Sequence, residues 1–418
     1  MLTPHQIELV KATVPVLQAH GVDLTKHFYA RMLSKNPELR NVFNQAHQAR
    51  GAQQQALAAA VLAYAQNIEH PENLLGAVKQ IAQRHCSLGI RAEQYQIVGH
   101  HLIESIKEVL GAAATPELID AWTAAYGMLA DILIKAEQDI YNQQTAAQGG
   151  WSGWRPFECV NRVQESEDVV SFYFRPTDGG PVPSYLPGQY TTVRVFSKAM
   201  QIAQPRQYTL SQAAGSGMLR ISVKLVLGTQ GAPDGLVSSI LHNRVKVGDV
   251  VELSAPTGGF ALEDAKSEHP LVLIAAGIGI TPMVPMLETL AVENPLRKVH
   301  FLYTTQNLAH YPLKKEVTPR LRACPTPPRG FSSPSRVRPT ISVLTTMLPA
   351  VLRPPTSATS ARIRMPTSSS AARSASCRMS PRPSRTSVLS RLASTRKCSV
   401  PARPINFPST LSTQGCVC

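Results

Sequence analysis

One glycine-rich stretch of this sequence has the residue types and spacing of a phosphate-binding turn. "GIGITP" directly follows the apolar run "PLVLIAA" and leads into the helical pattern "TPMVPMLETLAVE". Glycines at such a turn let the backbone approach a pyrophosphate, and the start of a helix supplies unpaired N–H groups. A plain tight turn is the alternative interpretation. The candidate contacts are Gly277, Ile278, Gly279, Ile280, Thr281 and Pro282.

Three motifs precede this stretch, in the order found in ferredoxin-reductase-like flavoproteins: "LPGQY", "RQYTLS" and "GLVSSILH". The resemblance implies an FAD site in which Arg206 pairs with a phosphate, Tyr208 lies against the isoalloxazine and Thr209 bonds the ring edge. Taken singly, Arg206 can equally be a solvated charge and Tyr208 a core residue. The remaining implied contacts are Tyr190, Gln207, Gly235 and, at the start of a helix aimed at the pyrophosphate, Val237 and Ser238.

His85, in "IAQRHCSLGI", is a candidate metal ligand, although a single histidine among 12 is more often exposed or structural. Residues 1–148 resemble the globin domain of the flavohaemoglobins, which are bacterial nitric oxide dioxygenases. Together with the flavin and nicotinamide motifs, the resemblance covers roughly residues 1–316. It implies a haem b whose iron is bound by His85, with Tyr95 and Glu137 fixing the imidazole and increasing its electron donation.

The same resemblance implies a distal pocket on the other side of the haem. Tyr29, in "KHFYARML", is implied to stabilise dioxygen through its hydroxyl, supported by Gln53. Phe43 is implied to pack on the porphyrin. Gln53 and Leu57 lie four residues apart, which places them on one helical face.

Two features depart from the family pattern. Arg84 and Cys86 flank His85 where Lys and Thr or Ser are expected, and Arg84 preserves a positive charge toward the flavin. The family's closing motifs, Cys-Gly-Pro followed by Phe-Met and a later Phe-Gly-Pro, do not occur in this sequence.

The composition changes abruptly after Glu316. Residues 317–418 contain no Asp or Glu, although the preceding residues hold all 27. Sixteen of the 42 basic residues lie in this tail, so residues 1–316 carry 26 basic against 27 acidic residues, a net charge of −1. The overall charge of +15 therefore does not indicate a nucleic-acid-binding body. The body contains only Cys86 and Cys159, which suits a reducing cytoplasm.

A shifted reading frame explains both the tail and the missing motifs. Codons that can encode residues 365–378, read one base out of frame, spell Asp-Ala-Asp-Phe-Phe-Val-Cys-Gly-Pro-Leu-Gly-Phe-Met-Pro. The same shift over residues 396–401 permits Glu-Val-Phe-Gly-Pro. The hypothesis is that residues 317–418 are a disordered, out-of-frame translation of the nicotinamide lobe. The alternatives are a basic nucleic-acid tail and a low-complexity linker.

The elements that must position these residues change type twice along the chain. Apolar spacings of three and four predict an all-α region over 1–148, with Thr115 capping a helix, and the resemblance identifies this region as the globin domain. Alternating, β-branched runs predict an antiparallel β-barrel over 149–262, which the resemblance identifies as the FAD domain. Two buried-type strands around a helix predict the start of a parallel α/β lobe over 263–316, by resemblance the NAD(P)-binding lobe, which the tail is not expected to complete.

The resemblance implies an NAD(P)H-dependent nitric oxide dioxygenase, which converts NO and O₂ to nitrate at a haem re-reduced through FAD and so detoxifies nitric oxide. The alternative is a globin that binds O₂ or NO without sustained turnover, because its reductase is incomplete. No export signal or apolar run long enough for a membrane span is evident. We therefore expect a cytoplasmic monomer whose partners are NO and O₂, without nucleic acid or membrane insertion.

Overall fold

The computed structural model describes residues 2–43, 48, 51–229, 233–317 and 342–347. The chain divides into two units, residues 1–350 and 351–418, and all described residues belong to the first. The predictions for the tail therefore fall largely on residues outside the described part.

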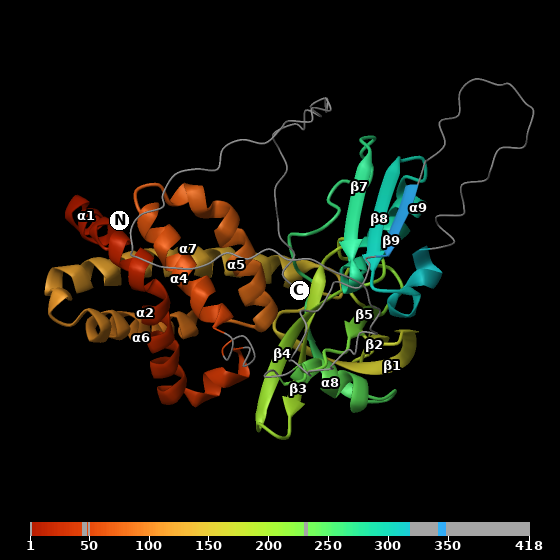
Figure 1. Cartoon of the computed structure of the whole chain (residues 1–418), viewed down its shortest axis with the longest axis horizontal. Coiled ribbons are helices and arrows are strands. Elements are labelled where there is room, and N and C mark those ends of the chain that lie inside the picture. Colours follow the sequence, from red (N-terminus) through yellow and green to blue (C-terminus); the bar gives the residue numbers. More distant parts are fainter. Residues whose placement is uncertain (1, 44–47, 49–50, 230–232, 318–341, 348–418) are drawn as a thin grey trace, which may run out of the picture. The chain divides into compact units, whose positions relative to one another are not determined.

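Helices alone occupy the described residues before position 148, as predicted (Figure 1). They are α1 (Pro4–Ala12), α2 (Val14–Lys35), α4 (Ala52–Gln66), α5 (Leu75–Leu88), α6 (Ala92–Leu110) and α7 (Pro116–Ala146), with 3₁₀ turns at Pro37–Asn41, Pro71–Leu74 and Gly111–Ala113. The predicted cap of α7 is confirmed, because the Thr115 hydroxyl accepts a hydrogen bond from the Leu118 N–H at 3.3 Å. Such caps satisfy an N–H that has no partner within the helix.

The run "IELVKATVPVL" is interrupted where the periodicity alone predicts one helix. α1 ends at Ala12 and α2 begins at Val14, with Thr13 between them. Pro15 has no N–H to donate, so the position it tolerates best is the first turn of a new helix. The Thr13 hydroxyl donates instead to the Val10 carbonyl at 2.6 Å.

A buried histidine joins α2 to α6. His101 is 3% exposed, its Nε2 lies 2.7 Å from Asn36 Oδ1, and its Nδ1 contacts the Arg31 guanidinium. Since Arg31 can only donate, Nδ1 must accept, and the imidazole is therefore neutral. Burial and, next, the positive charge of Arg31 lower the pKa of His101.

This contact predicts a pH dependence of stability. Because the pKa of His101 is lowered by folding, the unfolded chain binds more protons, and the free energy of unfolding should fall as pH drops below about 6.5. We expect His101→Gln, which can still donate to Asn36, to flatten this dependence in urea titrations followed by helical circular dichroism. His100→Gln, at the exposed neighbour, is the control; equal slopes in both variants would contradict the assignment.

The second region is an antiparallel sheet that wraps around a core of its own, as predicted. Its strands are β1 (Trp154–Ser166), β2 (Val169–Pro176), β3 (Tyr190–Ser197), β4 (Ile202–Thr209), β5 (Leu219–Lys224) and β6 (Val250–Ser254), with α8 at Leu236–Asn243. Their order is β4-β3-β6-β1-β2-β5, and an isolated bridge between Leu210 and Ile221 links the two ends of the sheet. Phe157, Phe172 and Phe174 are fully buried inside it.

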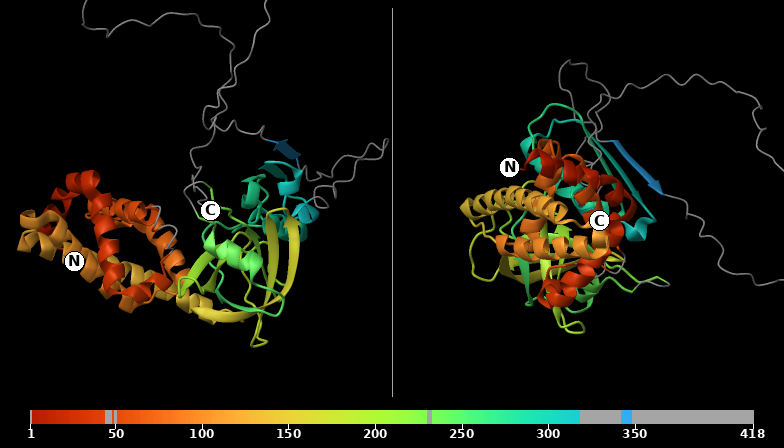
Figure 2. Two further views of the ribbon diagram at one scale, coloured as in Figure 1. Left: turned by 60° about the horizontal axis from the view of Figure 1, so that its bottom comes forward. Right: turned by 90° about the vertical axis from the view of Figure 1, so that its left-hand side faces the viewer.

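The third region is a parallel sheet with one strand more than predicted. β7 (Leu271–Ala276), α9 (Met283–Glu293) and β8 (Val299–Thr305) match the prediction, and the helix packs on the sheet through Leu287 and Leu290. β9 (Ser342–Met347), inside the predicted tail, then pairs in parallel with β8 (Figures 1 and 2). The expectation of a disordered tail is wrong for these six residues, because "SVLTTM" is rich in residues that favour strands.

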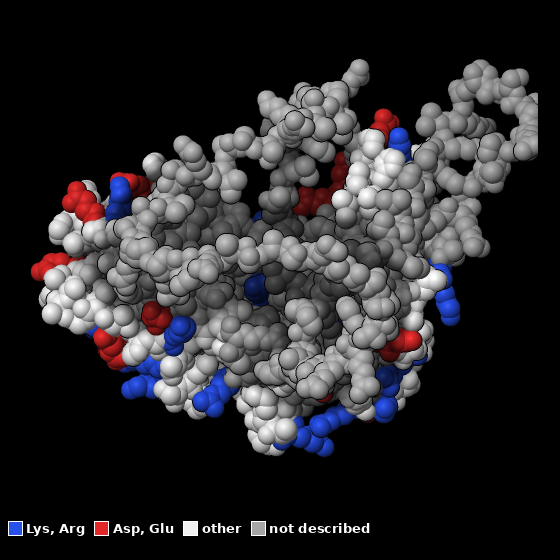
Figure 3. Space-filling view, viewed as in Figure 1, with Lys and Arg blue, Asp and Glu red and all other residues white. Residues whose placement is uncertain are grey.

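Lys and Arg side chains are interspersed with Asp and Glu side chains on the face of the described part shown in Figure 3. This mixture agrees with the near-zero net charge of residues 1–316. In the described part of the chain, none of the helices combines the length and the apolar character needed to cross a bilayer.

Candidate active site

Three helices bring His85, Tyr95 and Glu137 together inside the helical domain. His85 lies near the end of α5, Tyr95 near the start of α6 and Glu137 in α7. Nδ1 of His85 lies 2.7 Å from Oε1 of Glu137 and 3.0 Å from the Tyr95 hydroxyl, which itself donates to the same carboxylate oxygen. Glu137 is only 2% exposed. Because Nδ1 is engaged, Nε2 is the nitrogen left to bind a metal ion.

The position of Tyr95 is fixed by a second tyrosine. The Tyr126 hydroxyl donates to the Tyr95 carbonyl oxygen at 2.7 Å, and the Tyr126 ring lies against Gly99. A Cβ at Gly99 would lie 2.4 Å from Tyr126 Cε1, so no side chain fits there. Burial, followed by the hydrogen bond to Glu137, raises the pKa of Tyr95, which keeps its hydroxyl protonated as a donor.

Cys86, next to His85, does not compete as a ligand. Burial and then the charge of Glu137 raise the pKa of its thiol to about 12, and the thiol lies 3.5 Å from the Glu137 carbonyl oxygen. Metal binding requires the thiolate. Among the described residues, no three His, Cys, Asp or Glu side chains cluster in a way that could hold a metal ion. A metal at His85 would therefore need a prosthetic group to supply its other ligands, and a haem does so.

The predicted distal residues lie on α2, on α4 and on the segment between them. Tyr29 is 8% exposed, and its ring meets that of Phe43 edge-on with centroids 5.6 Å apart. Burial raises the pKa of Tyr29 to about 12. Leu57 packs against the helical core, and the Gln53 Oε1 is buried without a partner in the described part of the chain. An unpaired buried acceptor beside an apolar wall suits a site that a ligand completes.

An open hollow of about 300 Å³ reaches the Tyr29 side chain. Gln54 and Gln48 contribute to its lining, and Gln54 Nε2 donates to Gln48 Oε1 at 2.9 Å. The predicted residue Gln53 is not part of this lining. Sequence reasoning missed Gln54, whose only local signal is its place next to Gln53 in the run "QQQ".

The motifs assigned to flavin lie on two paired strands. Tyr190 pairs with Thr209 and Thr192 with Gln207 across β3 and β4, so the alternation of strand side chains places Tyr190, Gln207 and Thr209 on one face. Gln207 Nε2 lies 3.4 Å from the Tyr190 hydroxyl. Arg206 and Tyr208 then point to the opposite face, where Tyr208 packs against the barrel core. The side chains of "RQYTLS" therefore lie on both faces of the sheet.

Arg206 is a partly buried cation with no carboxylate partner among the described residues. Burial lowers its pKa, and its one described hydrogen bond runs from Nη1 to the adjacent Pro205 carbonyl oxygen at 2.7 Å. An unpaired buried charge is costly, so this guanidinium suits an anion such as a phosphate. Burial also raises the pKa of Tyr208.

The start of α8 is closely packed. Gly235 precedes the helix, and a Cβ there would lie 2.6 Å from Ser238 Oγ and 2.7 Å from Val226 Cβ. The Ser238 hydroxyl donates back to the Gly235 carbonyl oxygen at 2.9 Å, and Val237 is buried in the barrel core. The side chains of Val237 and Ser238 are thus used internally, and any contact to a pyrophosphate would come from the N–H groups of this turn.

The sequence suggested that "GIGITP" opens the helix directly, but the structure places a separate turn before the helix. Gly277–Ile280 form a 3₁₀ turn, and α9 begins only after Thr281 and Pro282. Gly277 has φ of +51°, a conformation that favours glycine, and its carbonyl oxygen accepts from the Tyr303 hydroxyl at 3.0 Å. Pro282 directly precedes α9, a position that suits a residue without a backbone N–H.

A hydrogen bond between distant parts of the sequence was not predicted. Ser87, fully buried and two residues after His85, accepts from Gln207 Nε2 at 2.9 Å. Arg84 on the same helix is exposed, and its charge acts to lower the pKa of Tyr190, which burial raises. Ser87 carries no sequence signal of this role, because its partner lies 120 residues away.

Comparison with known proteins identifies two family models in this chain. Residues 26–133 match the model described as globin, and residues 156–262 match that of the oxidoreductase FAD-binding domain.

Relatives match across both regions. The flavohemoprotein of Bordetella pertussis is 52% identical over 318 residues, which are 76% of this chain and 78% of that protein. The flavohemoprotein of Chromobacterium violaceum is 54% identical over 307 residues, or 73% of this chain and 76% of the relative. The crystal structure of flavohemoglobin from Malassezia yamatoensis with bound FAD and heme superposes with a TM-score of 0.70 at 30% identity, covering 82% of this chain and 84% of that one.

Proposed function

Because this chain belongs to the flavohaemoprotein family, we propose that its activity is that of a nitric oxide dioxygenase, an oxidoreductase that converts NO and O₂ to nitrate and uses NAD(P)H when its nicotinamide lobe is complete. The observation that carries the proposal is the buried cluster of His85, Tyr95 and Glu137, which leaves one imidazole nitrogen open. When bound, haem b supplies the iron at which the gases react, and FAD passes electrons from NAD(P)H to it one at a time.

Each proposed residue has a role that its contacts support. His85 would hold the iron through Nε2, while Glu137 accepts a hydrogen bond from the Nδ1–H group and makes the imidazole a stronger donor. Tyr95 holds that carboxylate in place. On the distal side, the hydroxyl of Tyr29 stays protonated at physiological pH because its pKa is about 12. It is therefore a permanent hydrogen-bond donor toward dioxygen, supported by Gln53 on α4.

The residues of the FAD-binding region are proposed to bind the flavin through a charged contact to its phosphate and through contacts to its ring. Arg206 pairs with an FAD phosphate, Tyr208 lies against the ring and Thr209 bonds its edge, with Tyr190 and Gln207 as further FAD contacts. The remaining cofactor contacts proposed are Phe43, Leu57 and Arg84 for haem, Gly235, Val237 and Ser238 for FAD, and Gly277 to Pro282 for NAD(P)H. The domain limits at 148, 262 and 316, the monomeric state and the cytoplasmic location remain predictions.

A globin that binds O₂ or NO without sustained turnover is the second candidate. It is favoured by the exposure of Val272 and Ile274 on the parallel sheet, where a complete nicotinamide lobe would be covered.

The dioxygenase proposal can be tested without electron supply from the reductase region. The haem-loaded chain is reduced chemically, freed of reductant, exposed to O₂ and then mixed with one equivalent of NO. Stoichiometric nitrate is expected, and nitrite, or NO that persists, would contradict the proposal. Steady NADH oxidation in the presence of NO and O₂ distinguishes the dioxygenase from a globin without sustained turnover.

Tyr29→Phe should weaken the hold on dioxygen. The variant loses the one donor at this position and keeps the ring contact with Phe43. A hydrogen bond to a group that gains negative charge contributes about 1.5–3 kcal/mol, so O₂ should dissociate roughly 10- to 100-fold faster in stopped-flow experiments. Tyr64→Phe is the control, since the buried Tyr64 hydroxyl donates to the Ala125 carbonyl oxygen at 2.8 Å. Equal O₂ dissociation rates in the two variants would remove Tyr29 from this role.

A further inference from the structure

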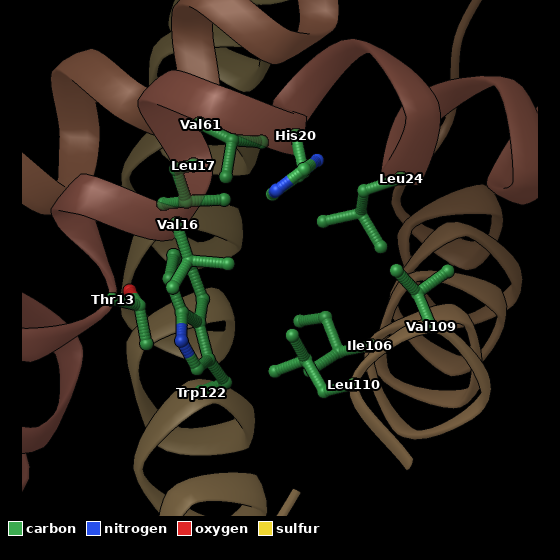
Figure 4. Close-up of a pocket in the computed structure, with 10 residues that line it drawn as sticks. All are labelled: Thr13, Val16, Leu17, His20, Leu24, Val61, Ile106, Val109, Leu110 and Trp122. Carbon is green, nitrogen blue, oxygen red and sulfur yellow. The ribbon is translucent and has the colours of Figure 1, made fainter. Parts of the chain in front are cut away.

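An apolar cavity of about 30 Å³ lies among the helices of the globin domain, apart from the side chains assigned to haem. Figure 4 shows it between Val16 and Trp122 on one side and Leu24, Ile106 and Val109 on the other. Leu24, Ile106 and Trp122 belong to the buried helical core. The cavity therefore extends from the domain surface into its interior.

The cavity is poorly suited to water. The Thr13 hydroxyl in its lining is already used, because it donates to the Val10 carbonyl oxygen at 2.6 Å. The other polar groups in the lining are the imidazole of His20 and the indole N–H of Trp122. A buried water normally makes two to four hydrogen bonds, so these two groups would meet its lowest requirement at best.

The volume of the cavity limits its occupant. One water-sized molecule needs about 10–15 Å³ of such space, so 30 Å³ admits a diatomic molecule or a rare-gas atom and excludes an acyl chain. Val16 and Val109 are 41% and 40% exposed, and His20 is exposed, so the cavity opens to solvent at these residues.

Two helices, α2 and α4, contribute residues both to the inner wall of the cavity and to the distal pocket. On α4, Val61 in the wall lies four residues after Leu57, and such a pair shares one helical face. On α2, Leu24 in the wall lies four residues before Phe28, whose ring contacts that of Tyr29 with centroids 5.0 Å apart. About one helical turn separates the cavity from the distal residues along both helices.

We propose that this cavity takes up small neutral gases, O₂ and NO, and delivers them to the distal pocket along the seam between α2 and α4. The proposal rests on the proposed function for the identity of the gases. Both gases are small and uncharged, so they partition from water into an apolar space.

Xenon is the probe for occupancy. The methyl groups of Leu24, Val61 and Ile106 are observed by NMR in the full-length, haem-loaded, carbon monoxide-bound ferrous protein while xenon pressure is raised. We expect saturable shifts at these three residues in the unmodified protein, and their loss in Val16→Phe, whose larger side chain fills the cavity. Shifts confined to other residues, or a water molecule detected at these methyl groups, would overturn the proposal.

Delivery is tested by the association rate of carbon monoxide after flash photolysis. Val16→Phe should slow association severalfold. Val22→Phe should not, since Val22 lies on the same helix with a similar exposed fraction of 36% and does not line the cavity. Equal rates in both variants would overturn the delivery role, and the xenon result on the unmodified protein would stand if Val16→Phe failed to fold. Intact xenon uptake without nitrate formation would instead locate the failure in the proposed dioxygenase function.

Discussion

The chain as written is expected to fail in sustained NADH-driven consumption of NO, whereas the chain with its reading frame restored after Glu316 is expected to succeed. Restoration means one base inserted or removed in the codons that follow Glu316. We expect flavin reduction by NADH to be nearly absent in the first protein and rapid in the second. Both proteins should bind haem and FAD, because the residues assigned to those groups precede the frame change.

The physical reason lies in the parallel sheet. Leu273 and Ala275 on β7 are buried in the core that α9 also joins, but Val272 and Ile274 on the opposite face are 54% and 68% exposed. Parallel strands are normally covered on both faces by helices. The match to the Bordetella pertussis relative covers 78% of that protein and leaves 22% unmatched. The restored frame would supply the strands and helices that cover this face and complete a nicotinamide site.

The measurement is NADH absorbance during exposure to NO and O₂, with chemically reduced single turnover as the control for an intact globin. Equal NADH-driven rates in the two proteins would contradict the frame hypothesis and show that the tail as written completes the lobe. Failure of both proteins in single turnover would instead place the defect in the globin.

Local sequence patterns predicted the elements whose signals are themselves local. The cap at Thr115 rests on neighbouring residues, and the run of β-branched and aromatic residues "VVSFYFRP", which predicts a strand, coincides with β2. The third strand of the parallel sheet was missed, since the surrounding Ser, Pro and Arg residues obscured a short β-branched run. The break at Thr13 was also missed, because periodicity continues across it and only Pro15 reveals it.

Local sequence patterns could not predict which residues meet at the candidate site. His85, Tyr95 and Glu137 lie on three helices, and the separation of 52 residues between His85 and Glu137 follows no local period. Only the resemblance to the flavohaemoglobins grouped them before the structure was known. The bond between Ser87 and Gln207 is a product of packing over 120 residues, and neither residue type indicates the other.

Glu137→Gln is expected to raise the reduction potential of the haem and to slow its reaction with NO and O₂ roughly 10- to 100-fold. Glu137 is the only carboxylate that contacts Nδ1 of His85 in the described part of the chain, at 2.7 Å, and it is 2% exposed. A buried anion in this position pulls the Nδ1 proton and so increases electron donation by the imidazole. Glutamine keeps the size and one acceptor oxygen, so the fold and both hydrogen bonds can persist while the charge is lost.

Tyr95→Phe distinguishes the effect of the Glu137 charge on the haem potential from the effect of the position of the imidazole ring. It removes the hydroxyl that donates to Glu137 but leaves the contact between Glu137 and His85. Its effect on the potential should therefore be smaller than that of Glu137→Gln and opposite in sign, since the carboxylate loses a competing donor. Redox titration of the haem together with the iron–histidine stretching frequency, measured by resonance Raman, reports both changes. If the two substitutions shift the potential equally and in the same direction, Tyr95 and Glu137 act only as a structural pair, because the buried charge then contributes nothing beyond the position of the ring.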